Sequence, residues 1–176
     1  MKTAHDYFTK ANDCFNKGNY YEAIEYYSMA LKLDKKHLNT YINLGNVFMQ
    51  QKAYQKALNS YNLGLRIKPT YAPLYYNRAI AKNKLGKFAE AIKDYDVAIK
   101  LDPTAAYYYV NRGNAKRNML NYFEAIEDYS KAILLNPALM EAYYNRGLTK
   151  IQLEGNTALA QEDIAMALHL KNFQKQ

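Results

Sequence analysis

One interval recurs along the whole chain and limits what the chain can fold into. An alanine recurs every 34 residues, except for the last interval, which is 35 residues long. A tyrosine near the start of each interval recurs every 34 residues throughout. The alanines are Ala23, Ala57, Ala91, Ala125 and Ala160, and the tyrosines are Tyr7, Tyr41, Tyr75, Tyr109 and Tyr143. A fixed period of this length predicts an array of stacked units instead of one closed core.

Each interval is predicted to form two α-helices joined by a short turn. In the third interval, the first helix is expected over Ala72–Leu85 and the second over Phe88–Lys100, with Gly86 as the breaking residue between them. Pro103 closes the unit, because the residue that precedes a proline is pushed out of the helical region. On this division the units are 4–37, 38–71, 72–105, 106–139 and 140–174, and they form a single domain of residues 1–176.

Small and large side chains stand at fixed places within the units. Counted from the first residue of each unit, position 4 is Tyr, positions 8 and 27 are Ala or Gly, and position 20 is Ala. Position 24 is Tyr in four of the five units. Small residues that face large ones across a helix pair let the two backbones approach closely. An isolated pair of this kind cannot bury its faces, so the units are expected to stack.

This pattern resembles the tetratricopeptide repeat, which has the same period, and the resemblance covers residues 4 to about 172. It implies an all-α fold, a right-handed superhelical solenoid of five antiparallel helix pairs. In that fold the first helices line a concave groove. Members of the family mostly act as binding scaffolds without catalysis. The resemblance therefore implies an adaptor for protein–protein interaction, whose partner is a protein or a peptide.

Charge and cysteine content limit the partners and the compartment. The formal net charge is +8, but the lysines at the expected helix ends are interleaved with acidic residues, so we expect no nucleic-acid partner. The single cysteine, Cys14, excludes an internal disulfide bond and is compatible with a reducing compartment. No apolar run resembles a signal peptide or a membrane span, so we expect a cytoplasmic protein with no membrane partner.

The sequence offers no support for catalysis or for a bound cofactor. The three histidines, His5, His37 and His169, lie far apart in the repeat frame, and Cys14 has no paired base. There is no glycine-rich phosphate loop and no cluster with metal-ligand spacing. We therefore expect no enzymatic activity, no cofactor and no metal ion.

The first helices carry a polar stripe that is a candidate binding surface. At about 100° per residue, positions 2, 6, 9 and 13 point away from the packed positions 4, 8 and 11, and the resemblance places them in the groove. Twelve of these twenty residues are Asn or Gln, and only Lys84 and Glu141 carry a full charge. Because side-chain amides both donate and accept hydrogen bonds, this amide stripe can bind the backbone of an extended peptide.

Asparagine occupies position 6 in four consecutive units, although it is a mediocre helix former. This resembles the asparagine ladders with which other tetratricopeptide superhelices hold extended chains. The alternative is that these amides bind neighbouring helices or water. Residues at position 5 border the stripe and either receive ligand side chains or pack against the adjacent unit. The predicted peptide-binding residues are Asn12, Asn43, Asn46, Asn77, Lys84, Asn111, Asn114 and Asn145, with Tyr76 and Tyr144 at position 5.

The same resemblance argues against one ligand class of the family, the chaperone tail. Members that bind chaperone tails hold a carboxylate with a clamp of cations and asparagines. Asn12 and Asn43 match the asparagines of that clamp, but Phe8, Pro73 and Asn77 stand where its cations belong. The carboxylate clamp is therefore absent from this sequence.

Arginine at position 7 and aspartate at position 23 occur in the same units. The three units with Arg at position 7 have Asp at position 23, and the other two units have neither. This covariation predicts ion pairs within the helix pairs, while the alternative is a basic track for phosphates that includes the lysines at position 11. Asp96, at position 25, is expected to face solvent. The predicted pairs are Arg78 with Asp94, Arg112 with Asp128, and Arg146 with Asp163.

The last helix, expected over Thr157–Leu170, is more apolar than its counterpart in the fourth unit. Leu159 and Met166 stand where that unit has charged residues. Because a terminal unit has no neighbour to cover it, we expect these two residues to mediate self-association end to end, with a homodimer as one outcome. The alternatives are an exposed apolar end that the protein tolerates, a tail that folds back through Phe173, and a following segment that covers the helix.

Overall fold

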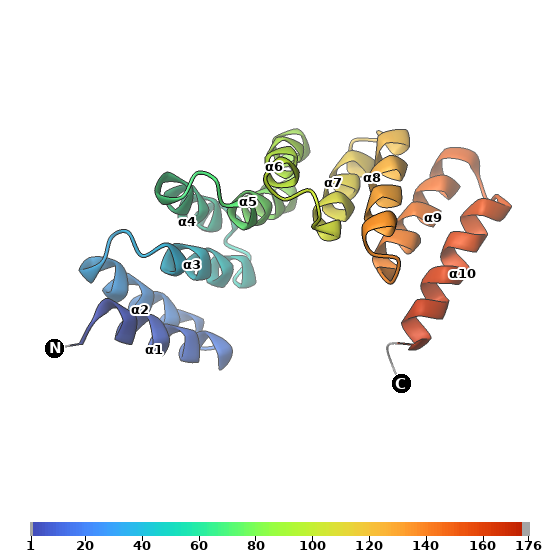
Figure 1. The fold of residues 1–176 in the computed structure, drawn as a ribbon. Helices are drawn as coiled ribbons and strands as arrows, with labels where there is room; N and C mark the ends of the chain where they lie inside the picture. The colour runs from blue at the N-terminus through green and yellow to red at the C-terminus, as the bar shows by residue number, and fades with distance from the viewer. Residues whose placement is uncertain (1, 174–176) are drawn as a thin grey trace. The chain divides into compact units, whose positions relative to one another are not determined.

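The chain divides into two compact units, Met1–Leu85 and Gly86–Gln176, and the computed structural model describes residues 2–173. The described residues form ten α-helices and no strand, so the all-α prediction is confirmed (Figure 1). The first unit contains α1 (Ala4–Asn16), α2 (Tyr20–Leu33), α3 (Leu38–Gln50), α4 (Tyr54–Ile67) and α5 (Ala72–Lys84). The second unit contains α6 (Phe88–Leu101), α7 (Ala106–Asn118), α8 (Tyr122–Leu135), α9 (Met140–Glu154) and α10 (Ala158–Phe173).

The helices follow the expected boundaries closely, except at the C-terminal end. Every odd-numbered helix begins at the first residue of an expected repeat, and α5 and α6 each end within one residue of the prediction. In contrast, α10 continues three residues beyond Leu170 and includes Phe173. The exposed Phe173 ring lies against His169 of the same helix, with ring centroids 4.9 Å apart. Phe173 therefore extends the helix and does not anchor a folded-back tail; residues 174–176 lie outside the described residues.

The turn after each first helix contains a residue in the left-handed region of backbone space. Gly18, Gly86 and Gly155 adopt φ values of 79°, 74° and 83°, which glycine does without steric cost. Lys52 and Leu120 adopt the same conformation in the second and fourth repeats, with φ values of 58° and 64°. For these two residues the conformation costs about 1–2 kcal/mol. The turn is thus set by the packing of the helix pair and tolerates a residue that does not favour it.

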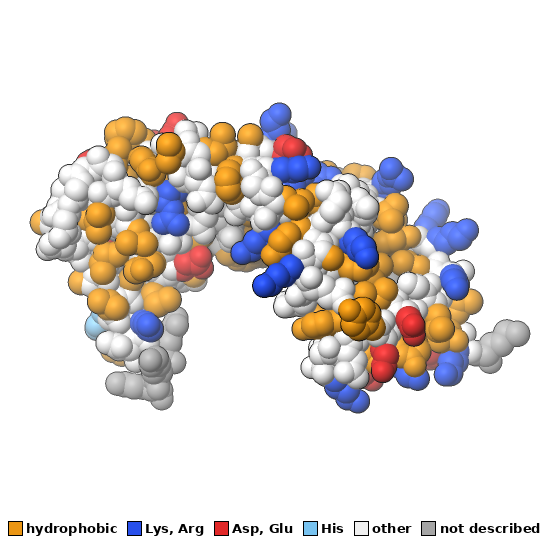
Figure 2. Space-filling view, turned by 180° about the vertical axis from the view of Figure 1, so that it is seen from behind, with side chains coloured by type: hydrophobic (Ala, Val, Ile, Leu, Met, Phe, Trp, Pro, Cys, Tyr) orange, Lys and Arg blue, Asp and Glu red, His pale blue; other side chains and the backbone are white. Residues whose placement is uncertain are grey.

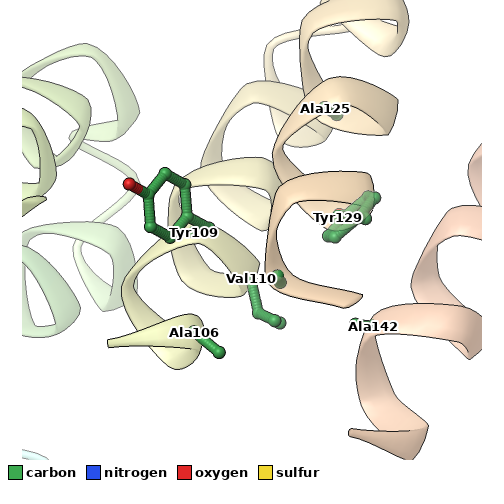
Figure 3. Close-up of a cluster of buried hydrophobic side chains, with 7 residues drawn as sticks. Ala106, Tyr109, Val110, Ala125, Tyr129 and Ala142 are labelled. Atoms are coloured by element: carbon green, nitrogen blue, oxygen red, sulfur yellow. The ribbon is translucent and has the colours of Figure 1, made fainter. Parts of the chain in front are cut away.

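Inside the helix pairs, a buried tyrosine at position 24 packs on the small residue at position 8. Tyr129 is fully buried, and a Cβ added to Gly113 would lie 2.8 Å from its Cε1 atom. Figure 3 shows Tyr129 in a hydrophobic cluster that also contains Ala142 of the following repeat. The core therefore continues from one repeat into the next, as stacking requires.

A second tyrosine, at position 4, joins successive repeats through the backbone. The Tyr75 hydroxyl donates to the carbonyl oxygen of Pro69 at 2.9 Å, and the Tyr109 hydroxyl donates to that of Pro103 at 3.2 Å. Tyr41 makes the equivalent bond at 3.1 Å. Each of these bonds reaches position 32 of the preceding repeat and helps to fix how the first helix sits on that repeat.

Candidate functional site

In the first unit, asparagines of the amide stripe are bonded to one another and to buried tyrosines. The Asn12 Oδ1 atom accepts hydrogen bonds from the Tyr27 hydroxyl at 2.6 Å and from Asn43 Nδ2 at 2.8 Å. The Asn46 Oδ1 atom accepts from the Tyr61 hydroxyl at 2.8 Å. Burial raises the pKa of Tyr27 to about 12, so its hydroxyl stays protonated and donating at neutral pH. Position 9 therefore anchors the core tyrosine of its own repeat.

The second unit repeats this arrangement. The Asn114 Oδ1 atom accepts from the Tyr129 hydroxyl at 2.8 Å and from Asn145 Nδ2 at 3.0 Å. Asn111 Nδ2 donates to the carbonyl oxygen of Tyr107 at 2.9 Å, within α7. Asn114 and Asn145 thus bind neighbouring helices, as the alternative interpretation of the stripe expected, whereas this bond of Asn111 stays within α7.

Asn77 differs from the other asparagines at position 6. Within the described residues, the structure records no hydrogen bond to its side-chain amide. Asn77 instead lines a hollow of about 270 Å³ on the first unit. The other lining residues are Phe15, Asn46, Met49, Gln50, Tyr61 and Ile80. This hollow brings an available amide next to apolar side chains from α1, α3 and α5.

The residues at position 5 pack between repeats wherever a further repeat covers them. Phe8 packs against the cluster that contains Val47 of the second repeat, and Val110 is buried in one cluster with Ala142 of the fifth repeat. Tyr76 is partly buried, whereas Tyr144 on the last repeat is exposed. The packing interpretation of position 5 therefore holds for Phe8 and Val110, and ligand contacts of Tyr76 and Tyr144 stay a prediction.

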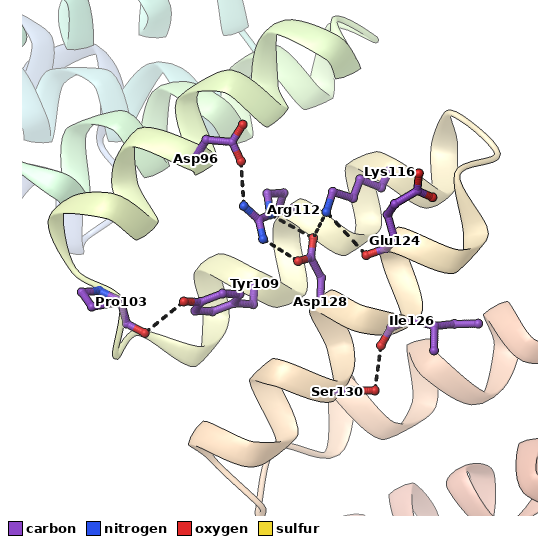
Figure 4. Close-up of polar contacts among 9 residues, drawn as sticks. All are labelled: Asp96, Pro103, Tyr109, Arg112, Lys116, Glu124, Ile126, Asp128 and Ser130. Atoms are coloured by element: carbon purple, nitrogen blue, oxygen red, sulfur yellow. Dashed lines mark hydrogen bonds and ion pairs between the residues drawn. The ribbon is translucent and has the colours of Figure 1, made fainter.

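Asp128 is held by two cations of α7. Arg112 donates through Nε and Nη2 to its two carboxylate oxygens, at 2.9 Å and 2.6 Å, and Lys116 Nζ lies 2.8 Å from its Oδ2 atom (Figure 4). The ion pair predicted from covariation is confirmed here. The lysine at position 11, which departs from the usual apolar residue of the resemblance, is the second partner of the same carboxylate.

Arg112 also reaches the preceding repeat. Its Nη1 atom donates to Asp96 Oδ1 at 2.7 Å, although the Asp96 side chain is 51% exposed (Figure 4). Asp96 faces solvent as expected, but its bond with Arg112 is not expected from the sequence. The physical reason is that position 25 of one repeat stacks beside position 7 of the next, as the bond from Arg78 Nη1 to Asn62 Oδ1 at 2.7 Å also shows.

Comparison with protein families agrees with this architecture. A model described as tetratricopeptide repeat matches residues 3–70, and a model described as TPR repeat matches residues 81–119 and 121–153. The chain belongs to the tetratricopeptide repeat family. A comparison with curated proteins gives no match.

Solved structures of tetratricopeptide repeat proteins have the same fold. A fragment of MamA, residues 41 to the end, from Desulfovibrio magneticus RS-1 superposes with a TM-score of 0.91 at 19% identity, covering 100% of this chain and 99% of that chain. YrrB, described as a TPR protein with an unusual peptide-binding site, gives 0.77 at 24% identity, covering 96% and 87%. The first TPR of Spaghetti (RPAP3), bound to the HSP90 peptide SRMEEVD, gives 0.65 at 29% identity, covering 68% and 95%.

The charged residues of this tetratricopeptide array are dispersed on the face drawn in Figure 2. Lys and Arg side chains lie there in small groups, with hydrophobic and uncharged side chains between them. Lys84, the cation of the amide stripe, is exposed at the end of α5. Among residues 2–173, no group of three or more His, Cys, Asp or Glu side chains could hold a metal ion. None of the described helices is long and apolar enough to cross a membrane.

The last helix pair repeats the ion-pair network and predicts how stability depends on pH. Although burial raises the pKa of Asp163, its bonds with Arg146 and Lys150 at 2.6 Å and 2.8 Å outweigh this and hold that pKa below the ordinary 3.8. Because the pKa of Asp163 is lowered in the folded protein, its ionised carboxylate stabilises the fold at pH values above the unfolded-state pKa. This stabilisation is lost as the pH falls through the folded-state pKa of Asp163.

Urea unfolding of wild type and Asp163→Asn between about pH 6 and pH 3 measures this contribution. The wild type is expected to lose its advantage over the variant only at the acid end of this range. A constant difference between the two proteins down to pH 3 would show that Asp163 does not contribute in this way.

Leu159 and Met166 are exposed, but the structure does not set Met166 apart. Met166 is 43% exposed, close to the 39% and 40% of Met29 and Leu63 at the same position of α2 and α4. Exposure of an apolar residue at position 26 is therefore ordinary for the second helices of this chain. Leu168 lies two residues beyond Met166, about 200° around the helix. It lines a hollow that the sequence did not indicate. The role of Leu159 and Met166 in self-association stays a prediction.

Proposed function

We propose that this chain is an adaptor that binds an extended peptide along the amide stripe of its first helices. The observation that carries the proposal is the hollow of the first unit, in which the Asn77 amide lies beside Phe15, Met49 and Ile80. The amide can donate to and accept from a peptide backbone, and the apolar side chains can surround one apolar side chain of the peptide. A volume of about 270 Å³ suits one side chain better than a drug-sized ligand, whose clefts measure about 300–1,000 Å³.

A related structure supports a peptide as the ligand. The RPAP3 repeat domain, 29% identical to this chain, is bound to an HSP90 peptide. The ligand of this chain is held differently, because Phe8, Pro73 and Asn77 stand where the carboxylate clamp has its cations. We therefore expect recognition through the peptide backbone and an apolar side chain instead of a terminal carboxylate.

Asn77→Ala is expected to weaken peptide binding without lowering stability. Ligands would be selected from a phage-displayed library of random dodecapeptides on the wild-type chain, and their affinities measured by isothermal titration calorimetry. Loss of the amide should reduce affinity by about 1–3 kcal/mol, because a peptide group desolvated in the hollow loses its partner. The Tm should be equal or slightly higher, since alanine is the better helix former.

Asn59→Ala is the matched control, because Asn59 is an exposed amide on α4, outside the stripe. This variant should bind the selected peptides like wild type. Equal affinities of the Asn77 and Asn59 variants, or a clear loss of stability in Asn77→Ala, would contradict the proposal. Binding should also change little with salt, whereas a steep linear fall of log K with log salt would indicate phosphate contacts and a nucleic-acid ligand.

A further inference from the structure

The last repeat has a second hollow that the amide stripe does not use. It measures about 320 Å³ and lies between the first turn of α9 and the C-terminal half of α10. Its lining residues are Met140, Tyr144, Ala167, Leu168 and Lys171. Tyr144 and Leu168 are both large apolar side chains that remain exposed. This surface, which we call the end face, is therefore apolar and uncovered within the described residues.

The equivalent surface of the fourth repeat is a repeat interface. There, Ala106 and Val110 are buried in one cluster with Ala142 of α9 (Figure 3). Ala132 is buried in the same cluster, and Leu139 packs against it. The first helix of the next repeat thus covers the places that Met140, Tyr144 and Ala167 hold in the last repeat. The end face continues the surface through which the other repeats stack.

The second repeat shows which side chain such a surface accepts. Leu74, at position 3 of α5, is fully buried and belongs to one cluster with Leu65 of α4, against which Leu38 of α3 packs. A Cβ added to Gly64 would lie 3.0 Å from a Leu74 methyl carbon and 3.6 Å from a Leu38 methyl carbon. A repeat with glycine at position 27 therefore accepts a leucine from the next first helix. The end face has Ala167 at this position, like Ala132 of the fourth repeat, whose cluster accepts the smaller Ala142.

The opposite end of the chain cannot supply that helix. Positions 3 and 10 of the first helix are buried in all the other repeats. In α1 these positions hold Asp6 and Asp13, which are exposed, and Asp6 completes a capping box with Thr3. Stacking α1 of a second copy on the end face would bury two carboxylates against a single lining cation, Lys171, which is unfavourable. Head-to-tail growth of the array is therefore disfavoured.

We infer that the end face binds the end face of a second copy of this chain, across a two-fold axis. The end face offers both a projecting Leu168 and a hollow beside it, so two copies can each insert an apolar side chain into the other. An interface that uses the same surface twice closes at two subunits and leaves no free end for growth. This inference goes beyond peptide binding, because the asparagines of the amide stripe take no part in it.

Sedimentation equilibrium over a range of protein concentrations tests the inference. The wild type should approach twice the chain mass of 20.4 kDa and no more. Leu168→Glu should raise the dissociation constant at least tenfold, roughly the effect expected from a charge in an apolar contact. Leu134→Glu is the matched control, because Leu134 is an exposed leucine of α8, is 73% exposed against 54% for Leu168, and does not line the hollow.

Each result bears on the inference. A wild type that stays monomeric at every concentration, or that grows beyond two chains, would overturn it. Equal effects of the Leu168 and Leu134 substitutions would show that the end face is not the surface used. Thermal unfolding would check that Leu168→Glu folds, and Tyr144→Gln gives a second variant of the same face that should also weaken the dimer.

Discussion

Asp128→Ala is expected to lower the free energy of unfolding by about 3–5 kcal/mol, because it breaks a largely buried ion pair. The Asp128 side chain is 5% exposed, and its partners Arg112 and Lys116 are 18% and 17% exposed. Removing the carboxylate leaves two cations without their shared partner in a poorly hydrated site. The cost comes mainly from these stranded charges, more than from the lost attraction. Urea unfolding followed by circular dichroism measures it.

Two controls isolate this effect. Glu127→Ala removes an exposed carboxylate one residue earlier on α8 and should change stability by less than about 0.5 kcal/mol. Asp96→Ala removes the exposed partner of Arg112, and an exposed pair contributes only about 0–1 kcal/mol. If Asp128→Ala and Glu127→Ala cost the same, the buried network would have no structural role.

The pairing of Arg112 with Asp128 is predictable because positions 7 and 23 change together across the repeats. The same signal contains the third member, since lysine at position 11 occurs in those three units and in no other. From the sequence alone, that lysine can also be interpreted as part of a basic track for phosphates. The contact with Asp96 is not predictable in this way, because it joins two repeats. The periodicity of one repeat says which residues share a helix face, but the stacking of repeats decides which faces meet.

The amide stripe shows the same limit. Helical periodicity places Asn12, Asn46 and Asn114 in the stripe, but it cannot tell which amides the fold itself uses. Position 9 meets the core tyrosine of its own repeat, which depends on how closely the two helices approach. The sequence offers only a partial signal. Leu148 at position 9 accompanies Ile164 at position 24 in the last repeat, but the third repeat keeps Tyr95 at position 24 although Ile80 stands at position 9.

The end face does not stand out when the last repeat is compared with the fourth. Leu159 and Met166 differ from charged residues of the fourth repeat, and this difference marks them in the sequence. Leu168 corresponds to Leu65 and Ile133, which are apolar in their own repeats, so nothing distinguishes it. No helix among the described residues covers it, and its exposure is visible only once the repeats are stacked in space.

Tyr129→Ala is expected to lower the free energy of unfolding by about 3–5 kcal/mol, the usual cost of removing a large buried aromatic side chain. Tyr129 is fully buried, and its ring fills the space that Gly113 leaves open. The backbone of the α7 and α8 pair is fixed by its neighbours and cannot close the cavity completely. The van der Waals attraction between the ring and its surroundings is therefore not recovered in the variant.

Tyr129→Phe separates the ring from the hydroxyl and should cost only about 1 kcal/mol, the net value of one hydrogen bond. The cost stays small because Asn114 Oδ1 still accepts the bond from Asn145, so no buried acceptor is left without a partner. Urea unfolding of the two variants gives the packing contribution as their difference. A Phe variant as unstable as the Ala variant would mean that the hydrogen bond to Asn114, and not the fit of the ring against glycine, holds this helix pair together.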